Sequence, residues 1–164
     1  MKGRKPFLFI LFTVLLCTTG RAQPRQGQLA EEIALPAPGG DTLRLSSLRG
    51  KVVLLDFWAS WCGPCRVANK GLGKIYSKYR DKGFEIYSVS FDADRDDWLK
   101  AVKKDKINWL QVNDPDINKS RVALSWEVYS IPTTYLIGRD GRLLAMDLEG
   151  KALENAVKVL LEQR

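Results

Sequence analysis

The chain contains no histidine in its 164 residues, and it has only three cysteines and two methionines. Without imidazole, a zinc site would need further soft ligands that three cysteines cannot supply, since structural zinc sites use four ligands drawn mainly from cysteine and histidine. So few cysteines also exclude the framework of several structural disulfides that holds many small secreted domains together. Any sulfur chemistry is therefore confined to three positions.

Basic residues exceed acidic ones, but the excess is concentrated at the start of the chain. The 26 lysines and arginines against 19 aspartates and glutamates give a net charge of +7. Four basic residues and no acidic residue fall within residues 1–22, so the rest of the chain has 22 basic and 19 acidic residues, a net charge of +3. No dense stripe of lysine and arginine interleaved with aromatic residues remains, and we expect no nucleic-acid partner.

Residues 1–22 have the three-part pattern of a secretory signal peptide. Basic residues precede an apolar run from Phe7 to Leu16, and small residues flank the expected cleavage point after Ala22. The apolar run is shorter than the about 20 residues that a membrane span needs. We therefore expect a cleaved signal and a periplasmic protein. Two alternatives stay open: a lipid attached to Cys17, which bulky Leu16 disfavours, and an uncleaved N-terminal anchor.

The chain after the signal, about 140 residues, is the size of one ordinary domain with its own core. Residues 23–31 contain glutamine, proline, arginine and glycine and are expected to form a flexible lead-in. Residues 32–164 are expected to form the single folded domain, and we find no internal repeat in them.

Two of the three cysteines lie in a motif that directly follows an apolar run, Trp61-Cys62-Gly63-Pro64-Cys65. Cysteines three positions apart at the start of a helix share one face of its first turn. Cys62 would lie at the helix N-terminus, where free N–H groups and the helix dipole stabilise a thiolate. We predict that Cys62 attacks a disulfide of a partner and that Cys65 resolves the mixed disulfide.

The residues between the cysteines fit this chemistry. Pro64 suits the first turn of a helix, where its missing N–H costs nothing, and Gly63 lets another backbone approach closely. The alternatives for the cysteine pair are a structural disulfide or half of a zinc site. A bridge this short constrains little of the chain, and the ligands for zinc are lacking.

The hydrophobic pattern predicts strands alternating with helices, arranged as a central mixed sheet with helices on both faces. Strands are expected at residues 51–58, 84–91, 109–112, 134–137 and 143–147. Helices are expected at residues 64–79, from Asp94 or Asp96 to Val102, at about 119–126, and at 152–162. In the first of these helices the expected buried face consists of Val67, Leu72, Ile75 and Tyr79.

Three segments together resemble the thioredoxin superfamily: the motif of residues 61–65, Asp56-Phe57-Trp58-Ala59, and Ser130-Ile131-Pro132-Thr133-Thr134. The resemblance extends from Glu32 to the C-terminus. The lead-in of residues 41–51 and the extra segment of residues 92–105 are similar to those of exported TlpA/ResA-like thiol-disulfide oxidoreductases. This resemblance implies a thioredoxin-like α/β fold with an N-terminal strand extension and an inserted helix-strand segment.

The resemblance also implies roles for two further residues. Asp56 would be a buried carboxylate beneath the dithiol, with a raised pKa, that exchanges protons with Cys65; the residues alone also allow a structural aspartate paired with a lysine or capped by backbone. Pro132 would follow a cis peptide bond and place the Ile131 backbone beside the sulfurs, ready to pair with an extended substrate. Many relatives carry a glutamate and a proline where this chain has Ala68 and Lys70.

Other aromatic and charged residues receive simpler interpretations. Trp61 is expected at a partly exposed rim that contacts substrate, with Trp58 packed beneath the site, and the remaining tryptophans, Trp98, Trp109 and Trp126, in packing positions. Arg66 is either solvated or helps to hold the thiolate. The acidic run of residues 92–97 is expected to cap a helix.

The function expected from these features is reduction of protein disulfides outside the cytoplasm. The Gly-Pro pair between the cysteines resembles the reducing members of the superfamily, whereas its oxidases usually carry a histidine there. Expected partners are protein disulfides, with apocytochrome c among them, and a membrane electron donor of the DsbD/CcdA type; no cofactor or metal beyond the cysteine pair is expected. The alternatives are a thiol peroxidase-like antioxidant enzyme and a non-catalytic peptide-binding or chaperone module.

Overall fold

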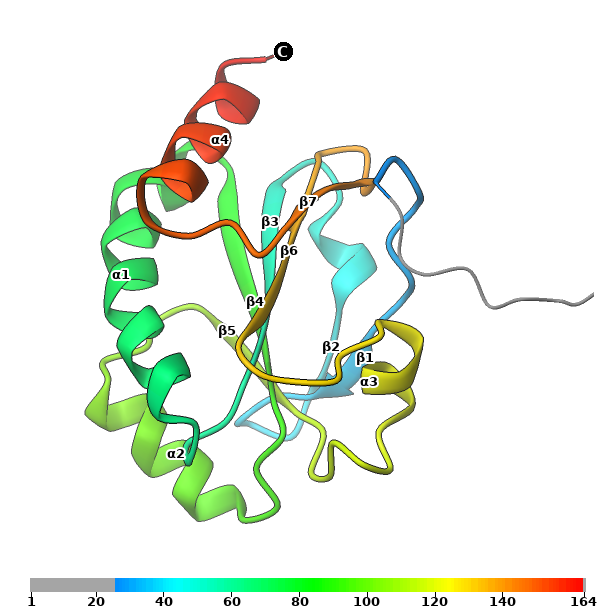
Figure 1. The fold of residues 1–164 in the computed structure, drawn as a ribbon, viewed down its shortest axis with the longest axis vertical. Coiled ribbons are helices and arrows are strands. Elements are labelled where there is room, and N and C mark those ends of the chain that lie inside the picture. Colours follow the sequence, from blue (N-terminus) through cyan, green and yellow to red (C-terminus); the bar gives the residue numbers. More distant parts are fainter. Residues whose placement is uncertain (1–25, 164) are drawn as a thin grey trace, which may run out of the picture.

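A computed structural model describes residues 26–163, so the expected signal of residues 1–22, with Cys17, lies outside the described residues. The core is a five-stranded mixed sheet with strand order β5-β4-β3-β6-β7 (Figure 1). Its strands are β3 (Val52–Trp58), β4 (Phe84–Ser90), β5 (Leu110–Asn113), β6 (Thr133–Ile137) and β7 (Leu143–Met146). The pairs β3–β4 and β4–β5 are parallel, and the pairs β3–β6 and β6–β7 are antiparallel.

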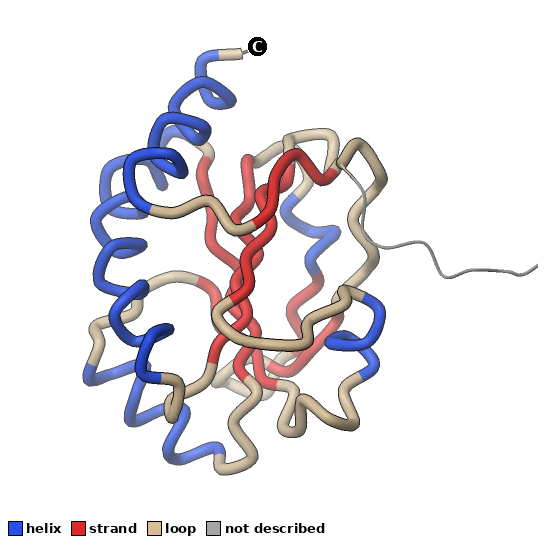
Figure 2. Tube along the Cα trace, viewed as in Figure 1, coloured by secondary structure: helices blue, strands red, loops and turns tan. Residues whose placement is uncertain are grey.

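Helices and a small second sheet surround this core (Figure 2). The helices are α1 (Gly63–Tyr79), α2 (Arg95–Lys104), α3 (Arg121–Ser125) and α4 (Gly150–Glu162), with short 3-10 helices η1 (Leu45–Leu48) and η2 (Arg80–Lys82). The second sheet pairs β1 (Ala34–Pro36) with β2 (Thr42–Arg44) in antiparallel fashion. These elements confirm the expected thioredoxin-like fold, its strand extension and its inserted helix-strand segment.

The sheet separates two apolar layers. One layer joins alternate residues of β3 and β4 to α1, α2 and α4, and the other joins the opposite residues of these strands to η1, α3 and β1. All residues of β3 are buried, because helices or loops cover both of its faces. The strand pattern had predicted this central position, since a strand covered on both sides is apolar throughout.

The register of the central strands decides which polar residues meet in the core. Asp56 on β3 lies opposite Ser88 on β4 and opposite Thr134 on β6. Asp56 shares a face with Leu54 and Trp58, since side chains alternate along a strand, and these two pack in the layer of α1 and α4. The carboxylate therefore points beneath the helix that carries the cysteines.

Two expectations differ from the structure. Val67, expected in the buried face of α1, is exposed, because the buried face runs through Cys65, Leu72 and Tyr76 and Val67 is turned about 200° from Cys65. Residues 26–31, expected to be a flexible lead-in, are hydrogen-bonded to the β6–β7 hairpin, and Leu29 forms a β-bridge with Arg142. Backbone hydrogen bonds to Gly141 and Leu143 hold this segment alongside the hairpin.

Candidate active site

The two cysteines of the motif form a disulfide at the start of α1. Cys62 is the N-cap residue of this helix, with an extended backbone conformation, and the N–H group of Cys65 points at its Sγ atom over 3.2 Å. A free N–H group of a first helical turn stabilises negative charge on that sulfur. The arrangement suits a Cys62 thiolate in the reduced protein.

The loop before β6 lies against the disulfide. The peptide bond between Ile131 and Pro132 is cis, as the resemblance implies, and the carbonyl oxygen of Ile131 lies 3.8 Å from the Sγ atom of Cys62. Trp61 is 63% exposed and stands beside the cysteines in sequence, and Gly63 and Pro64 are exposed in the first turn of α1. Of the predicted substrate-binding residues, Ile131 thus lies next to the sulfur of Cys62 in space, and Trp61, Gly63 and Pro64 lie next to Cys62 or Cys65 in sequence.

Asp56 is buried without a cationic partner. Its side chain accepts a hydrogen bond of 2.7 Å from the Ser88 hydroxyl, and none of the ion pairs within residues 26–163 includes it, which removes the alternative of an aspartate paired with a lysine. Burial raises the pKa of Asp56 from 3.8 to about 6, and the hydrogen bond from Ser88 opposes part of this rise. A carboxyl group of this pKa exchanges protons readily near neutral pH.

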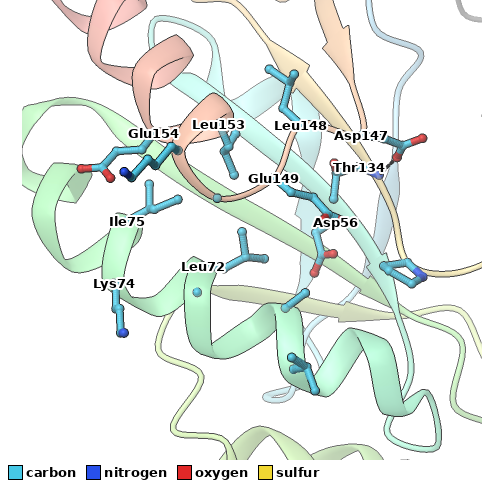
Figure 3. Close-up of a pocket in the computed structure, with 16 residues that line it drawn as sticks. Asp56, Leu72, Lys74, Ile75, Thr134, Asp147, Leu148, Glu149, Leu153 and Glu154 are labelled. Atoms are coloured by element: carbon cyan, nitrogen blue, oxygen red, sulfur yellow. Dashed lines mark hydrogen bonds between the residues drawn. The ribbon is translucent and has the colours of Figure 1, made fainter.

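A pocket of about 410 Å³ opens beside Asp56, between α1, β6 and α4. Figure 3 shows Leu72 and Ile75 of α1 facing Leu153 of α4 across it, with Asp56 at the strand side. Pro132 and Ala68 complete the wall nearest the cysteines. The pocket connects the buried carboxyl group with the surface next to the loop that contains Pro132.

A buried carboxylate anchors the loop that leads into α1. Asp92 accepts hydrogen bonds from the N–H group and the hydroxyl of Ser60, at 2.9 Å and 2.5 Å, and from the hydroxyl of Ser90 at 2.7 Å. The sequence placed Asp92 in an acidic run expected to cap a helix. Only Asp94 of that run serves as an N-cap, accepting from two N–H groups of α2.

Arg66 holds the same loop from its other side. Its guanidinium donates to the carbonyl oxygen of Ser60 at 3.0 Å and forms two hydrogen bonds with Asp105, which raise the pKa of Arg66. Both interpretations offered for Arg66, a solvated side chain and a partner of the thiolate, are therefore replaced by a structural one. The sequence held one sign of this arrangement: Asp92 and Asp105 mark the two ends of the extra segment of residues 92–105.

One exposed aromatic residue near the cis peptide bond was not singled out from the sequence. Tyr129, two positions before Ile131, is 81% exposed, the most exposed of the large hydrophobic residues in the described chain. The sequence could have pointed to Tyr129, because it lies just before the loop of residues 130–134. Within residues 26–163, no three Cys, Asp or Glu side chains are grouped so that they could hold a metal ion.

A thioredoxin-like sheet with a Cys-Gly-Pro-Cys disulfide at the start of α1 defines the class of protein: a thiol-disulfide oxidoreductase. The model of the AhpC/TSA family matches residues 26–146, and the chain belongs to this family. Among curated relatives, the thiol-disulfide oxidoreductase ResA of Bacillus subtilis (strain 168) is 28% identical over 154 residues, covering 86% of this chain and 84% of ResA.

Solved structures agree with this class. The thioredoxin domain of a thiol-disulfide oxidoreductase from Bacteroides vulgatus is 34% identical, with a TM-score of 0.79 over 84% of this chain and 99% of that domain. A thiol-disulfide oxidoreductase from Bacteroides fragilis is 36% identical, with a TM-score of 0.75 over 81% of this chain and 99% of that one.

Proposed function

We propose that this protein is an exported reductase of protein disulfides that acts through a mixed disulfide on Cys62. The observation that carries the proposal is the position of Cys62 as the N-cap of α1, with the N–H group of Cys65 directed at its sulfur. This position favours the thiolate that thiol-disulfide exchange requires. The Gly-Pro pair between the cysteines supports the reducing direction.

In the proposed mechanism, two electrons pass from the dithiol to the substrate. The Cys62 thiolate attacks one sulfur of the substrate disulfide; a new S–S bond forms, and the other substrate sulfur leaves as a thiolate that takes up a proton. Cys65 then gives its proton to the Asp56 carboxylate and attacks the Cys62 sulfur. The second substrate thiolate leaves, and the Cys62–Cys65 disulfide remains.

Reduction of this disulfide by a membrane electron donor of the DsbD/CcdA type would complete the cycle. An oxidising compartment requires such a steady supply of electrons. The Cys62–Cys65 pair itself is the redox centre in this proposal, and no separate cofactor takes part.

The proposed substrate is an extended segment of a protein that contains a disulfide. Trp61, Ile131 and Pro132 would receive its backbone beside Cys62, and Gly63 leaves room for it. Apocytochrome c is one candidate substrate, and misoxidised periplasmic proteins are another. The names of the relatives, thiol-disulfide oxidoreductases, support protein disulfides as the substrate class.

Export is proposed from the pattern of residues 1–22, with cleavage after Ala22 and a domain that faces the periplasm. Within residues 26–163, no helix is both long enough and apolar enough to cross a membrane. Sequencing the N-terminus of the protein recovered from the cell envelope tests this part. A first residue of Gln23 is expected, whereas a blocked Cys17 or an intact N-terminus would contradict cleavage after Ala22.

The catalytic proposal is tested by insulin reduction with matched cysteine variants. Cys62→Ser is expected to abolish reduction and mixed-disulfide formation, because the attacking thiolate is lost. Cys65→Ser is expected to lose turnover but to accumulate the mixed disulfide, because nothing resolves it. Cys17→Ser is the same change at the third cysteine and should retain activity.

Three outcomes would contradict the proposal. No insulin reduction by the wild-type protein, together with peptide binding that survives both Cys62→Ser and Cys65→Ser, would indicate a binding or chaperone module. Rapid consumption of hydrogen peroxide without disulfide reduction would indicate a peroxidase. A reduction potential of the cysteine pair as high as about −120 mV would indicate an oxidase.

A further inference from the structure

Three buried side chains form a continuous hydrogen-bonded chain beneath the active site. The indole N–H group of Trp109 donates to the Ser88 hydroxyl oxygen over 2.8 Å, and the Ser88 hydroxyl donates to Oδ2 of Asp56 over 2.7 Å. The exposed fractions are 6% for Trp109, 1% for Ser88 and 3% for Asp56. Ser88 is placed next to Asp56 by the register of β3 and β4, and Trp109 directly precedes β5.

The two hydrogen bonds run in one direction, from Trp109 through Ser88 to Asp56, because the three groups differ in what they can donate. An indole N–H group donates and never accepts, while a hydroxyl has one hydrogen and can also accept. Trp109 therefore occupies a lone pair of the Ser88 oxygen, and the Ser88 hydrogen is left for Asp56. Without the indole, the Ser88 hydroxyl could turn toward another acceptor.

Trp109 is itself held in place by the helix that carries the cysteines. Its ring packs edge-on against Tyr76 of α1, with ring centroids 5.8 Å apart. Gly73 of α1 is near the same ring: a Cβ atom added there would lie 3.8 Å from the Cζ3 atom of Trp109, an ordinary contact distance. The indole therefore has a fixed position between α1 and the start of β5.

We propose that Trp109 and Ser88 are positioning residues for Asp56: Trp109 orients the Ser88 hydroxyl, and the oriented hydroxyl favours the ionised carboxylate. The importance of this for catalysis rests on the proposed function, in which ionised Asp56 accepts the proton of Cys65. The orientation itself concerns only the three side chains and does not depend on any substrate.

Other charged groups near Asp56 line the pocket beside it. Within the described residues, none of them is hydrogen-bonded to the Asp56 carboxylate, which accepts from Ser88. They are Lys74 on α1, Asp147 and Glu149 in the connection from β7 to α4, and Lys151 and Glu154 on α4. The active-site cysteines at the start of α1 are joined in the disulfide and do not titrate. In the described part of the chain, Ser88 is the only side chain that hydrogen-bonds to the Asp56 carboxylate.

The experiment measures the titration of Asp56 in the oxidised full chain by NMR of ¹³C-labelled carboxyl groups. Ser88→Ala removes the donor and is expected to raise the Asp56 midpoint by about one pH unit, the typical size for loss of a hydrogen bond to a charged group. Trp109→Phe keeps the ring but removes the N–H group, and it is expected to raise the midpoint by roughly half as much.

Trp98→Phe is the matched control. Trp98 is buried in the same apolar layer as Trp109, but its indole N–H group has no hydrogen-bond partner in the described structure. The same substitution there should leave the Asp56 midpoint unchanged. A second measurement needs no variant: the indole ¹H–¹⁵N signal of Trp109 should shift with the midpoint of Asp56, and that of Trp98 should not.

The outcomes separate this proposal from the proposed function. An unchanged midpoint in Trp109→Phe, or a Trp109 indole signal that ignores the titration of Asp56, overturns the orienting role of Trp109. An unchanged midpoint in Ser88→Ala overturns the role of Ser88. If the midpoints move as expected but the pH profile of kcat for insulin reduction does not follow them, the orientation stands and the proton-transfer role of Asp56 fails.

Discussion

Asp56 is the residue at which stability and proposed function oppose each other. A carboxylate in an apolar strand loses its hydration, and here one hydroxyl replaces it. The folded protein therefore holds the Asp56 proton up to a higher pH than the unfolded chain does, with a pKa of about 6 instead of 3.8. Any stability that depends on this proton is fully present below about pH 4 and is lost as the pH rises through about 6.

Asp56→Asn is accordingly expected to stabilise the oxidised protein at neutral pH. The amide carries no charge and can still accept from Ser88, so the variant should be more stable at pH 7.5 by roughly 2–3 kcal/mol. Urea unfolding between pH 4 and pH 8 measures this gain, which should shrink toward pH 4. Asp97→Asn, at an exposed position of α2, is the control. Equal pH dependence in Asp56→Asn and the wild type would contradict the assignment.

The connection between β3 and α1 is the element on which the geometry of the cysteines depends. Ser60 is held on one side by Asp92 and on the other by Arg66, and both partners lie outside the motif. Asp92 lies two residues after the end of β4, and Arg66 is fixed by Asp105 just beyond α2. The inserted helix therefore supports the active-site loop.

Asp92→Asn tests this support. An asparagine amide offers one acceptor oxygen to three donors, and its NH₂ group would face N–H and O–H hydrogens, so a loss of about 2–3 kcal/mol in unfolding free energy is expected. Exchange of the Ser60 amide hydrogen, followed by NMR, should become faster by about 10-fold, because that hydrogen bond is lost. Unaltered protection of this amide would show that Asp92 does not hold the loop.

At the scale of the whole molecule, the segment before the second sheet contributes to the edge of the main sheet. Gly27 and Ala30 donate backbone hydrogen bonds to Leu143 and Gly141, and Gln28 accepts one from Leu143. The side chain of Arg142 also donates to the carbonyl oxygen of Gly27. These contacts lie on the β6–β7 hairpin and involve neither the two cysteines nor Asp56.

A chain that begins at residue 32 should therefore be less stable than one that begins at residue 23, yet equally active. Loss of four hydrogen bonds, offset by the freedom that the removed segment gains, predicts a decrease of about 1–2 kcal/mol in unfolding free energy. Denaturant unfolding and insulin reduction by the two chains measure both effects. Equal stability would indicate that the segment adds nothing to the domain, and lost activity would indicate an unforeseen role in catalysis.

The linear sequence was sufficient for the elements and the reactive pair. Apolar periodicity located β3, α1 and α4, and the spacing of Cys62 and Cys65 indicated their chemistry, because both depend on residues within a few positions of each other. The pattern wrongly placed Val67 in the buried face of α1, because the apolar residues of this helix are compatible with more than one buried face. Tertiary structure alone then chose the face that meets the sheet.

The partners of the polar residues were decided only by the folded arrangement. Asp56 and Ser88 are 32 positions apart, as are Ser60 and Asp92, and Arg66 and Asp105 are 39 apart. Strand register and helix docking bring such residues together, and no local pattern encodes the register of parallel strands separated by a helix. The sequence thus determined which groups can react, and the fold determined which neighbours set their charge and position, because hydrogen bonds act only between atoms that packing has already brought within about 3 Å.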